Sequence, residues 1–460
     1  MLSEFGLTGR ARPFVEIGTG DTRTAGVAVW DGAHWDTPGD VWAGTEPTWV
    51  DVSCYVYNYA CGYGRSDTLA RFLAGTANVV VDNSTGWADP SPAVTPGELS
   101  MRPGRQIRMG VVHRGGGADV VFGSSDVVFG ASDVTFGGGQ SDEVVVLWRG
   151  FIDSVVPVYD PVNTDTVELR CIDVLGEVNR AKTKPLPAPA YAGDTADVRI
   201  HRLLDAAGWW QNKRDISPTG DTLIGSDMGG QTADLLGQAA DSVGGAVFGD
   251  QHGFICFRPR DWQTFDPTDP TDATIGNVDP GDVCPVQWER PFERAAISTR
   301  VIIGRDPETA VQLDDIDGQA RYGIEPFERT NLLTQSDTRL QLLAERVLAT
   351  RDDSTAPKVR SVTLNAATSD ASLDLQATVD PFKPSRYRCR LSLPRGEVFD
   401  QQHFVTGVRH TVDRHGWETL VNLDLAGPYA VAGARWDDAY WGQARWTDAV
   451  RSMEGLTHVG

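Results

Sequence analysis

The side chains of this sequence that could do chemistry are one pair of histidines and a few adjacent carboxylates. His410 and His415 flank a predicted hairpin turn, but a metal site there needs further ligands that the local sequence does not offer. Asp314–Asp315 and Asp437–Asp438 could in principle supply the acid and the base of a glycosidase. Because the chain has 63 acidic residues, such pairs arise by chance. We therefore interpret the histidines as solvated turn residues and give the carboxylate pairs no catalytic role.

The motifs of common enzyme classes are missing from the sequence. It contains no His-Glu-x-x-His, no Gly-x-Ser-x-Gly and no P-loop, and the segment that begins Gly18-Thr-Gly lacks the third glycine of a dinucleotide loop. The carboxylates of the loop 82–89 are not at the alternating positions of an EF-hand. We predict instead a β-turn stabilised by Asn83 and Gly86. We therefore expect no enzyme activity, no cofactor and no metal site.

The cysteines do not form a recognisable framework. They are scattered and include no Cys-x-x-Cys pair, so we predict neither a disulfide scaffold nor a zinc site and interpret them as small buried hydrophobic residues. The six positions are Cys54, Cys61, Cys171, Cys256, Cys284 and Cys389.

The composition is that of a globular chain with several domains. A length of 460 residues predicts two to four domains, and 40% hydrophobic with 23% charged residues is ordinary for such proteins. The net charge of −22 argues against binding to duplex DNA or anionic lipid over a large surface. No apolar run approaches the roughly 20 residues of a membrane helix, and residues 1–10 lack the pattern of a signal peptide. We expect no membrane binding, and synthesis and assembly in a cytoplasm.

The elements that must position the side chains are mostly short strands bounded by Gly, Pro, Asn or Asp. Such a series favours a closed or sandwiched sheet over alternating βαβ units. We predict a first β-domain (1–181) with one short helix at 68–74, a proline-rich linker (182–193), a small α+β domain (194–262) and a second β-domain (263–430) with one helix at 337–350. The predicted strands are 50–57, 77–81, 106–112, 144–156, 166–172, 296–303, 359–364, 387–393, 404–411 and 419–425.

The helical segments carry cap signals. Asp194 or Thr195 is expected to begin one helix and Gly208 to end it. Thr232 is expected to begin a second, and Gly244 follows its end. Ser336 is expected to begin the helix at 337–350, whose apolar residues share one face. The segment 413–416 predicts a turn between the last two strands.

A heptapeptide repeat interrupts the first β-domain at 114–142, in three copies related to Ser-Asp-Val-Val-Phe-Gly. Because strand side chains alternate with period two, an odd repeat sends successive phenylalanines to opposite faces of a continuous strand. The repeat therefore suits short strand-and-turn units or a hairpin covered by neighbouring chains, and a tolerated insertion without chemistry is the favoured interpretation. Its phenylalanines Phe122, Phe129 and Phe136 are candidate interface residues.

The segment 431–460 repeats Ala-Arg-Trp-x-Asp-Ala. Tryptophan is enriched at interaction hot spots, so Trp436, Trp441 and Trp446 are candidate interface anchors. Packing of this arm back onto its own domain is an equally open interpretation.

Five segments occur in an order that resembles the first domain of the tail hub (minor tail) proteins of long-tailed actinobacterial phages. They are 49–56, 64–77, 78–90, 103–110 and 147–155. Later segments at 169–175, 203–209, 244–254 and 340–349 also resemble this family, and the likeness extends over about residues 12–430. The motifs are structural, and their order carries the resemblance.

The resemblance implies a mainly β, baseplate-hub-like fold in which two tail-tube-like β-barrels flank a small α+β domain. It implies a homotrimer whose pseudo-sixfold ring lies below the distal tail protein and the tape measure protein in the tail tip of a virion. The ring would carry other minor tail, tip or receptor-binding proteins, and DNA would pass through its lumen without specific binding. Two alternatives stay open: a carbohydrate-binding or glycan-degrading β-protein acting on the host cell wall, and the distal tail ring protein itself.

Overall fold

The computed structural model describes most of the chain. The described residues are 11–19, 47–89, 101–114, 142–160, 164–183, 191–226, 229–259, 262, 271–291, 297–351, 358–383, 385–394 and 396–425. Strands predominate among them, and the predicted mainly β fold with an α+β part is confirmed. No helix in these ranges is long and apolar enough to cross a membrane.

A 13-stranded sheet, called the core sheet below, occupies most of the molecule. Its strand order is β14-β18-β21-β20-β3-β4-β7-β6-β5-β1-β2, with β19 paired to β20 and β13 to β19. Within the described residues no pairing joins β14 to β2, so the sheet is open. The strands are β1 (Ala11–Thr19), β2 (Thr48–Asp51), β3 (Val56–Gly64), β4 (Leu73–Asp82), β5 (Gln106–Arg114), β6 (Asp142–Val158), β7 (Thr166–Ile172), β13 (Ala273–Gly276), β14 (Gln287–Glu289), β18 (Ser361–Asn365), β19 (Arg386–Ser392), β20 (Val398–Asp413) and β21 (Gly416–Leu425).

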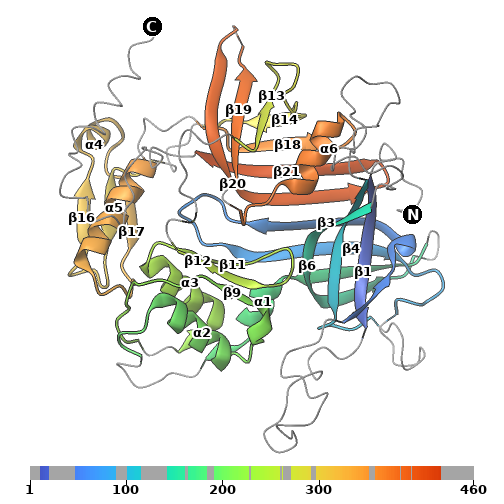
Figure 1. Ribbon diagram of the computed structural model, residues 1–460, viewed down its shortest axis with the longest axis horizontal. Helices are drawn as coiled ribbons and strands as arrows, with labels where there is room; N and C mark the ends of the chain where they lie inside the picture. The colour runs from blue at the N-terminus through green and yellow to red at the C-terminus, as the bar shows by residue number, and fades with distance from the viewer. Residues whose placement is uncertain are drawn as a thin grey trace, which may run out of the picture.

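The pairing of β3 with β20 joins the two β-rich regions of the sequence into this one sheet (Figure 1). The register runs antiparallel from Gly64 opposite Gly407 to Tyr59 opposite Val412. The two glycines allow this seam, because a Cβ at Gly64 would lie 2.2 Å from Gly407 Cα, and Gly64 has a φ of 131°. From Tyr59 to Gly64 buried residues alternate with half-buried ones, as one covered face of a sheet requires.

A second group of elements, the α/β unit, follows the first β-rich region and has its own hydrophobic core. Ile200, Leu203 and Leu236 pack there against Phe257 of the small sheet β11-β12-β9. Gly208 and Gly244 follow the two main helices with positive φ, as their sequence predicts. The elements are α1 (Val174–Asn179), α2 (Ala196–Ala206), α3 (Thr232–Ser242), β9 (Arg214–Ile216), β11 (Ala246–Gly249) and β12 (Ile255–Arg258), beside the short pair β8 (Lys182–Thr183) and β10 (Gly230–Gln231).

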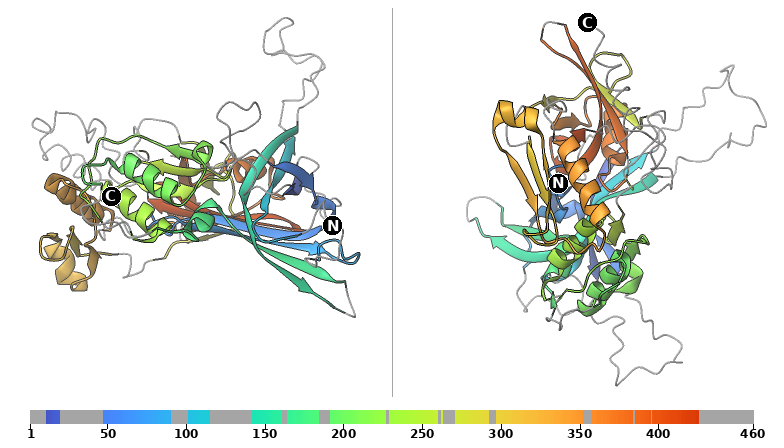
Figure 2. Two further views of the ribbon diagram at one scale, coloured as in Figure 1. Left: turned by 90° about the horizontal axis from the view of Figure 1, so that it is seen from below. Right: turned by 90° about the vertical axis from the view of Figure 1, so that its left-hand side faces the viewer.

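A third group, the β15–β17 unit, interrupts the second β-rich region. Its helix α5 covers the sheet β16-β15-β17 and buries Leu340, Leu343 and Val347. Ser336 begins this helix and accepts a hydrogen bond from Arg339 N at 3.3 Å. The elements are β15 (Arg300–Ile303), β16 (Val311–Asp314), β17 (Pro326–Arg329), α4 (Ile316–Tyr322) and α5 (Asp337–Thr350). Figures 1 and 2 show the α/β unit and the β15–β17 unit at the same end of the core sheet, away from β1 and β2.

Several predicted elements differ from the structure. The predicted helix at 68–74 is wrong: Asp67 Oδ1 accepts from Leu69 N and Ala70 N at 2.9 Å each and forms a turn, after which β4 begins at Leu73. The predicted strand at 50–57 is broken by the 3-10 helix η2 (Ser53–Tyr55). Thr232 lies inside α3 rather than before it, because its hydroxyl donates to Ala181 O at 2.7 Å. Other elements were also missed, among them the strand β1, the helices α1, α4 and α6 (Asp370–Thr378) and the 3-10 helix η3 (Gln211–Lys213).

Candidate functional site: a junction rich in arginine

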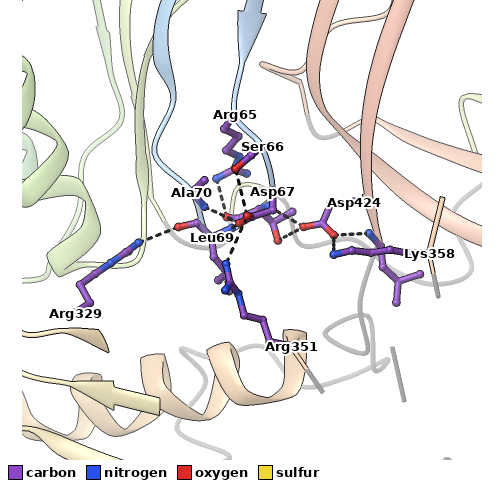
Figure 3. Close-up of polar contacts among 11 residues, drawn as sticks. Arg65, Ser66, Asp67, Leu69, Ala70, Arg329, Arg351, Lys358 and Asp424 are labelled. Carbon is purple, nitrogen blue, oxygen red and sulfur yellow. Dashed lines mark hydrogen bonds and ion pairs between the residues drawn. The ribbon is translucent and has the colours of Figure 1, made fainter. Parts of the chain in front are cut away.

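The loop between β3 and β4 lies where the core sheet, the α/β unit and the β15–β17 unit meet (Figure 3). Arg65 at its start is buried, and its backbone N–H donates to Thr406 O of β20 at 2.8 Å. The guanidinium of Arg65 donates to Thr68 O at 2.8 Å and lies over the ring of Phe72 at 4.8 Å. The side chain of Arg65 therefore holds the loop together through its contacts with Thr68 and Phe72.

Asp424 on β21 fixes the same loop from the side of the core sheet. Its carboxylate accepts from Thr68 N and Thr68 Oγ1 at 2.8 Å each and forms an ion pair with Lys358. Burial alone raises the pKa of Asp424, but Lys358 and the bonds from Thr68 outweigh it, so the pKa is lowered overall. A charged Asp424 thus holds the loop on the sheet.

Asp241 links the loop to the α/β unit and to the β15–β17 unit. Its carboxylate lies 2.6 Å from Arg71 Nε of the loop and 3.4 Å from the guanidinium nitrogen Nη1 of Arg329 on β17. Arg329 also donates to Leu69 O at 3.0 Å, and Arg351 lies 3.5 Å from the carboxylate of Asp67. These contacts connect all three units through a few side chains, as Figure 3 shows for the loop, Arg329 and Arg351.

A cavity of about 230 Å³, the junction cavity, lies among these groups. Its lining includes apolar side chains, among them Phe72, Leu343 and Val347. It also includes charged side chains, namely Arg65, Arg71, Arg329, Arg346, Asp234 and Asp241. Burial, followed by the neighbouring charge of Arg346, lowers the pKa of Arg65 to about 10.

The candidate residues from the sequence that the structure describes do not line the junction cavity. Phe122, Phe129, Phe136, Trp436, Trp441 and Trp446 all lie outside the described residues, as does the pair at 437–438. The Asp314–Asp315 pair has structural partners: Asp314 lies 2.7 Å from Arg300 Nε, and Asp315 begins α4 by accepting from Gly318 N. The turn at 82–89 is confirmed, since Asn83 O accepts from Gly86 N at 2.8 Å.

The interpretation of the two histidines is wrong for one of them. His415 is exposed, but His410 is completely buried, because the strand β20 turns it into the core beside Trp417 and Thr419. Burial lowers the pKa of His410 to about 3. The cysteines are likewise divided: Cys54 and Cys284 are exposed, whereas the other four are buried.

The described residues contain no group of three or more His, Cys, Asp and Glu side chains placed to hold a metal ion. The junction was not predicted as a site. The local sequence offers one signal, the two arginines Arg65 and Arg71 on either side of Asp67 between two apolar strands. The residues that contact this loop from α3, β17, α5 and β21 are distant in sequence.

Comparison with solved structures finds several proteins that this chain resembles. A tail protein from Neisseria meningitidis MC58 superimposes with a TM-score of 0.54 at 13% sequence identity, over 91% of this chain and 97% of that one. The 43 kDa tail protein of prophage MuSo2 from Shewanella oneidensis gives a TM-score of 0.49 at 11% identity, over 82% and 95% of the two chains. Prophage tail protein gp18 from Listeria monocytogenes EGD-e gives 0.43 at 8% identity, over 82% and 91%.

No protein-family model matches the chain, and no curated protein sequence matches it. The fold is therefore shared with the Neisseria tail protein along nearly the whole of both chains.

Proposed function

We propose that this chain is a structural hub protein of a bacteriophage tail tip and has no enzymatic activity. The observation that carries the proposal is the shared fold with the Neisseria tail protein over 91% of this chain and 97% of that one. The match runs along nearly the full length of both chains, which supports a structural role in a tail for the chain as a whole. The order of segments between Trp49 and Asp153, which resembles that of hub proteins, supports the hub position within a tail.

In the proposed assembly three copies form a ring in which each copy contributes the two β-rich regions that the core sheet joins. The ring lies below the distal tail protein, closes the tube beneath the tape measure protein and carries the tip proteins. The ion pairs of Asp241 with Arg71 and Arg329 hold the two smaller units on the core sheet within each copy. The phenylalanines of the heptapeptide repeat and the tryptophans of 431–460 are the proposed contacts with neighbouring subunits.

The proposal is tested by the mass of the purified chain and by the composition of tails. We expect a species of three times the 49.9 kDa chain in analytical ultracentrifugation, and labelling at the tail tip when virions are treated with antibodies to the chain. A strictly monomeric chain that is absent from virions would overturn it. Binding of that monomer to cell-wall polysaccharide would instead support the carbohydrate-binding alternative.

A further inference from the structure

We propose that the junction cavity is a docking site for the C-terminal segment of the same copy and that it holds the side chain of Trp436. This segment, residues 426–460, follows β21 directly and lies outside the described residues. Docking within one copy does not require the proposed role in a tail. It involves Trp436 alone, so Trp441 and Trp446 remain as the proposed contacts with neighbouring subunits.

The chain enters this segment beside the cavity. Leu425 is the last residue of β21, and Asp424 before it accepts two hydrogen bonds at 2.8 Å from Thr68, which lines the cavity. Trp436 is the first tryptophan after this point, and an extended chain from Leu425 to Trp436 spans up to about 36 Å. A second copy has to bring its segment to this place, whereas the segment of the same copy starts there.

The size and the apolar part of the cavity fit an indole ring. A cavity of about 150 Å³ is enough for a benzene ring, so the volume of about 230 Å³ has room for the larger indole. Phe72, Leu343 and Val347 in the lining offer apolar contacts to such a ring. Tryptophan gains most from such a place, because its side chain buries a large apolar area.

The charged part of the lining also suits an indole, and it does so without any unpaired charge. A guanidinium group packs on an aromatic face while it keeps its own ion pair. Arg329 already does this, since it lies over the ring of Phe327 at 5.5 Å and pairs with Asp241. Asp234 lines the cavity and is exposed, so its carboxylate can accept a hydrogen bond from the indole N–H.

An apolar surface beside the cavity faces solvent. Leu73 and Ala74 are exposed, Leu69 and Ala70 are half-buried, and all four line the cavity. Leu73 is 73% exposed, although it is a large apolar side chain. A group of exposed apolar residues at the edge of a cavity marks an interaction surface, and a segment that docks there removes this surface from water.

Photo-cross-linking of the full chain tests the docking. p-Benzoylphenylalanine, a photoreactive aromatic residue, replaces Trp436 in one protein and Trp446 in another, and the cross-linked peptides are mapped by mass spectrometry. We expect the residue at 436 to cross-link within one chain to the peptides that carry Leu73 or Val347. The residue at 446 belongs to the second copy of the same short repeat, so it is the matched control and is expected to give none of these cross-links.

Leu73→Glu, combined with the photoreactive residue at 436, is the second variant. It keeps the fold because Leu73 is mostly exposed, and it lowers the yield of these cross-links about fivefold or more, since the docked segment has to bury a carboxylate. Ile316→Glu changes an apolar side chain of similar exposure, 69%, that does not line the cavity, and the yield is expected to stay unchanged. Cross-links that join two chains, that miss the cavity, or that form equally from 436 and 446 would overturn the proposal, as would an undiminished yield in Leu73→Glu.

Discussion

Arg71 Nε lies 2.6 Å from Asp241 Oδ2, and this ion pair connects the β3–β4 loop to the last turn of α3. A carboxylate at the C-terminal end of a helix is unfavourable for the helix dipole. Asp241 is nevertheless buried there, and Arg71 together with Arg329 compensates its charge. Asp241 is thus one of the polar contacts that hold the α/β unit on the core sheet.

Replacement of this carboxylate is expected to destabilise the junction. Asp241→Asn leaves Arg71 and Arg329 without their anion, and we expect a loss of about 2–3 kcal/mol in the free energy of unfolding, less than for a fully buried pair because Arg71 is partly exposed. Urea denaturation measures it. Asp215→Asn is the control: Asp215 pairs with Arg258 but is 55% exposed, so its loss is expected within about 0.5 kcal/mol. Equal effects of the two substitutions would show that the junction is not held by Asp241.

The seam between the two β-rich regions is expected to tolerate no side chain at Gly64. A Cβ there would lie 2.2 Å from Gly407 Cα and 2.5 Å from Thr406 O, so Gly64→Ala must separate β3 from β20. We expect a loss of more than about 3 kcal/mol. Gly86→Ala is the control, because Gly86 has a φ of 72° but nothing within 4 Å of the added Cβ, and only the conformational cost of about 1 kcal/mol remains. Thermal or urea unfolding of both variants checks the difference.

The sequence predicts best those elements whose signals are local. The helix α5 follows its Ser336 cap and its apolar face, and the hairpin at Asp413–Gly416 follows its turn residues, since His415 N donates to Asp413 Oδ1. The helix predicted at 68–74 failed because the pattern of apolar residues there is helical, whereas Asp424, distant in sequence, holds Thr68 in a turn. Local propensity is overridden wherever a distant group supplies the stronger contact.

The junction could not be predicted for the same reason. Arg71 and Asp241 are 170 residues apart, and no spacing rule relates them. The burial of His410 was missed because its position near a turn suggested exposure, whereas the strand β20 extends from Val398 to Asp413 and alternates inward at that residue. Sequence patterns report the faces of single elements, whereas the pairing of β20 with β3, which makes β20 an inner strand of the core sheet, joins segments that are distant in sequence.

His410 is expected to make stability depend on pH. Its pKa is lowered to about 3 by burial, so the folded state holds it neutral while the unfolded chain takes up a proton below about pH 6.5. The wild type therefore loses stability from this group as the pH falls. His410→Gln removes that loss, and the difference between wild type and variant is expected to shrink by about 2 kcal/mol from about pH 7.5 to about pH 5. Urea unfolding at both pH values measures it, and His415→Gln, an exposed neighbour, is expected to follow the wild type.

Asp173 is expected to show the opposite dependence. Its carboxylate begins α1 and accepts from Gly75 N at 2.6 Å and from Gly176 N at 2.8 Å, while burial raises its pKa to about 7 against these bonds. A raised pKa means that the folded state binds the proton more tightly, so the stability from this group is present below about pH 4 and is lost as the pH rises through about 7.

Asp173→Asn tests this dependence, because an amide cannot titrate and can accept only one of the two N–H groups with its oxygen. We expect the variant to be less stable by about 1–3 kcal/mol, and the gap to the wild type to widen as the pH falls from about 8 to about 5. Urea unfolding across this range gives the gap directly. A gap that stays constant would mean that the carboxylate is already charged throughout, held so by its N–H donors. The same gap for His410→Gln narrows over this range, so a general acid effect cannot produce both results.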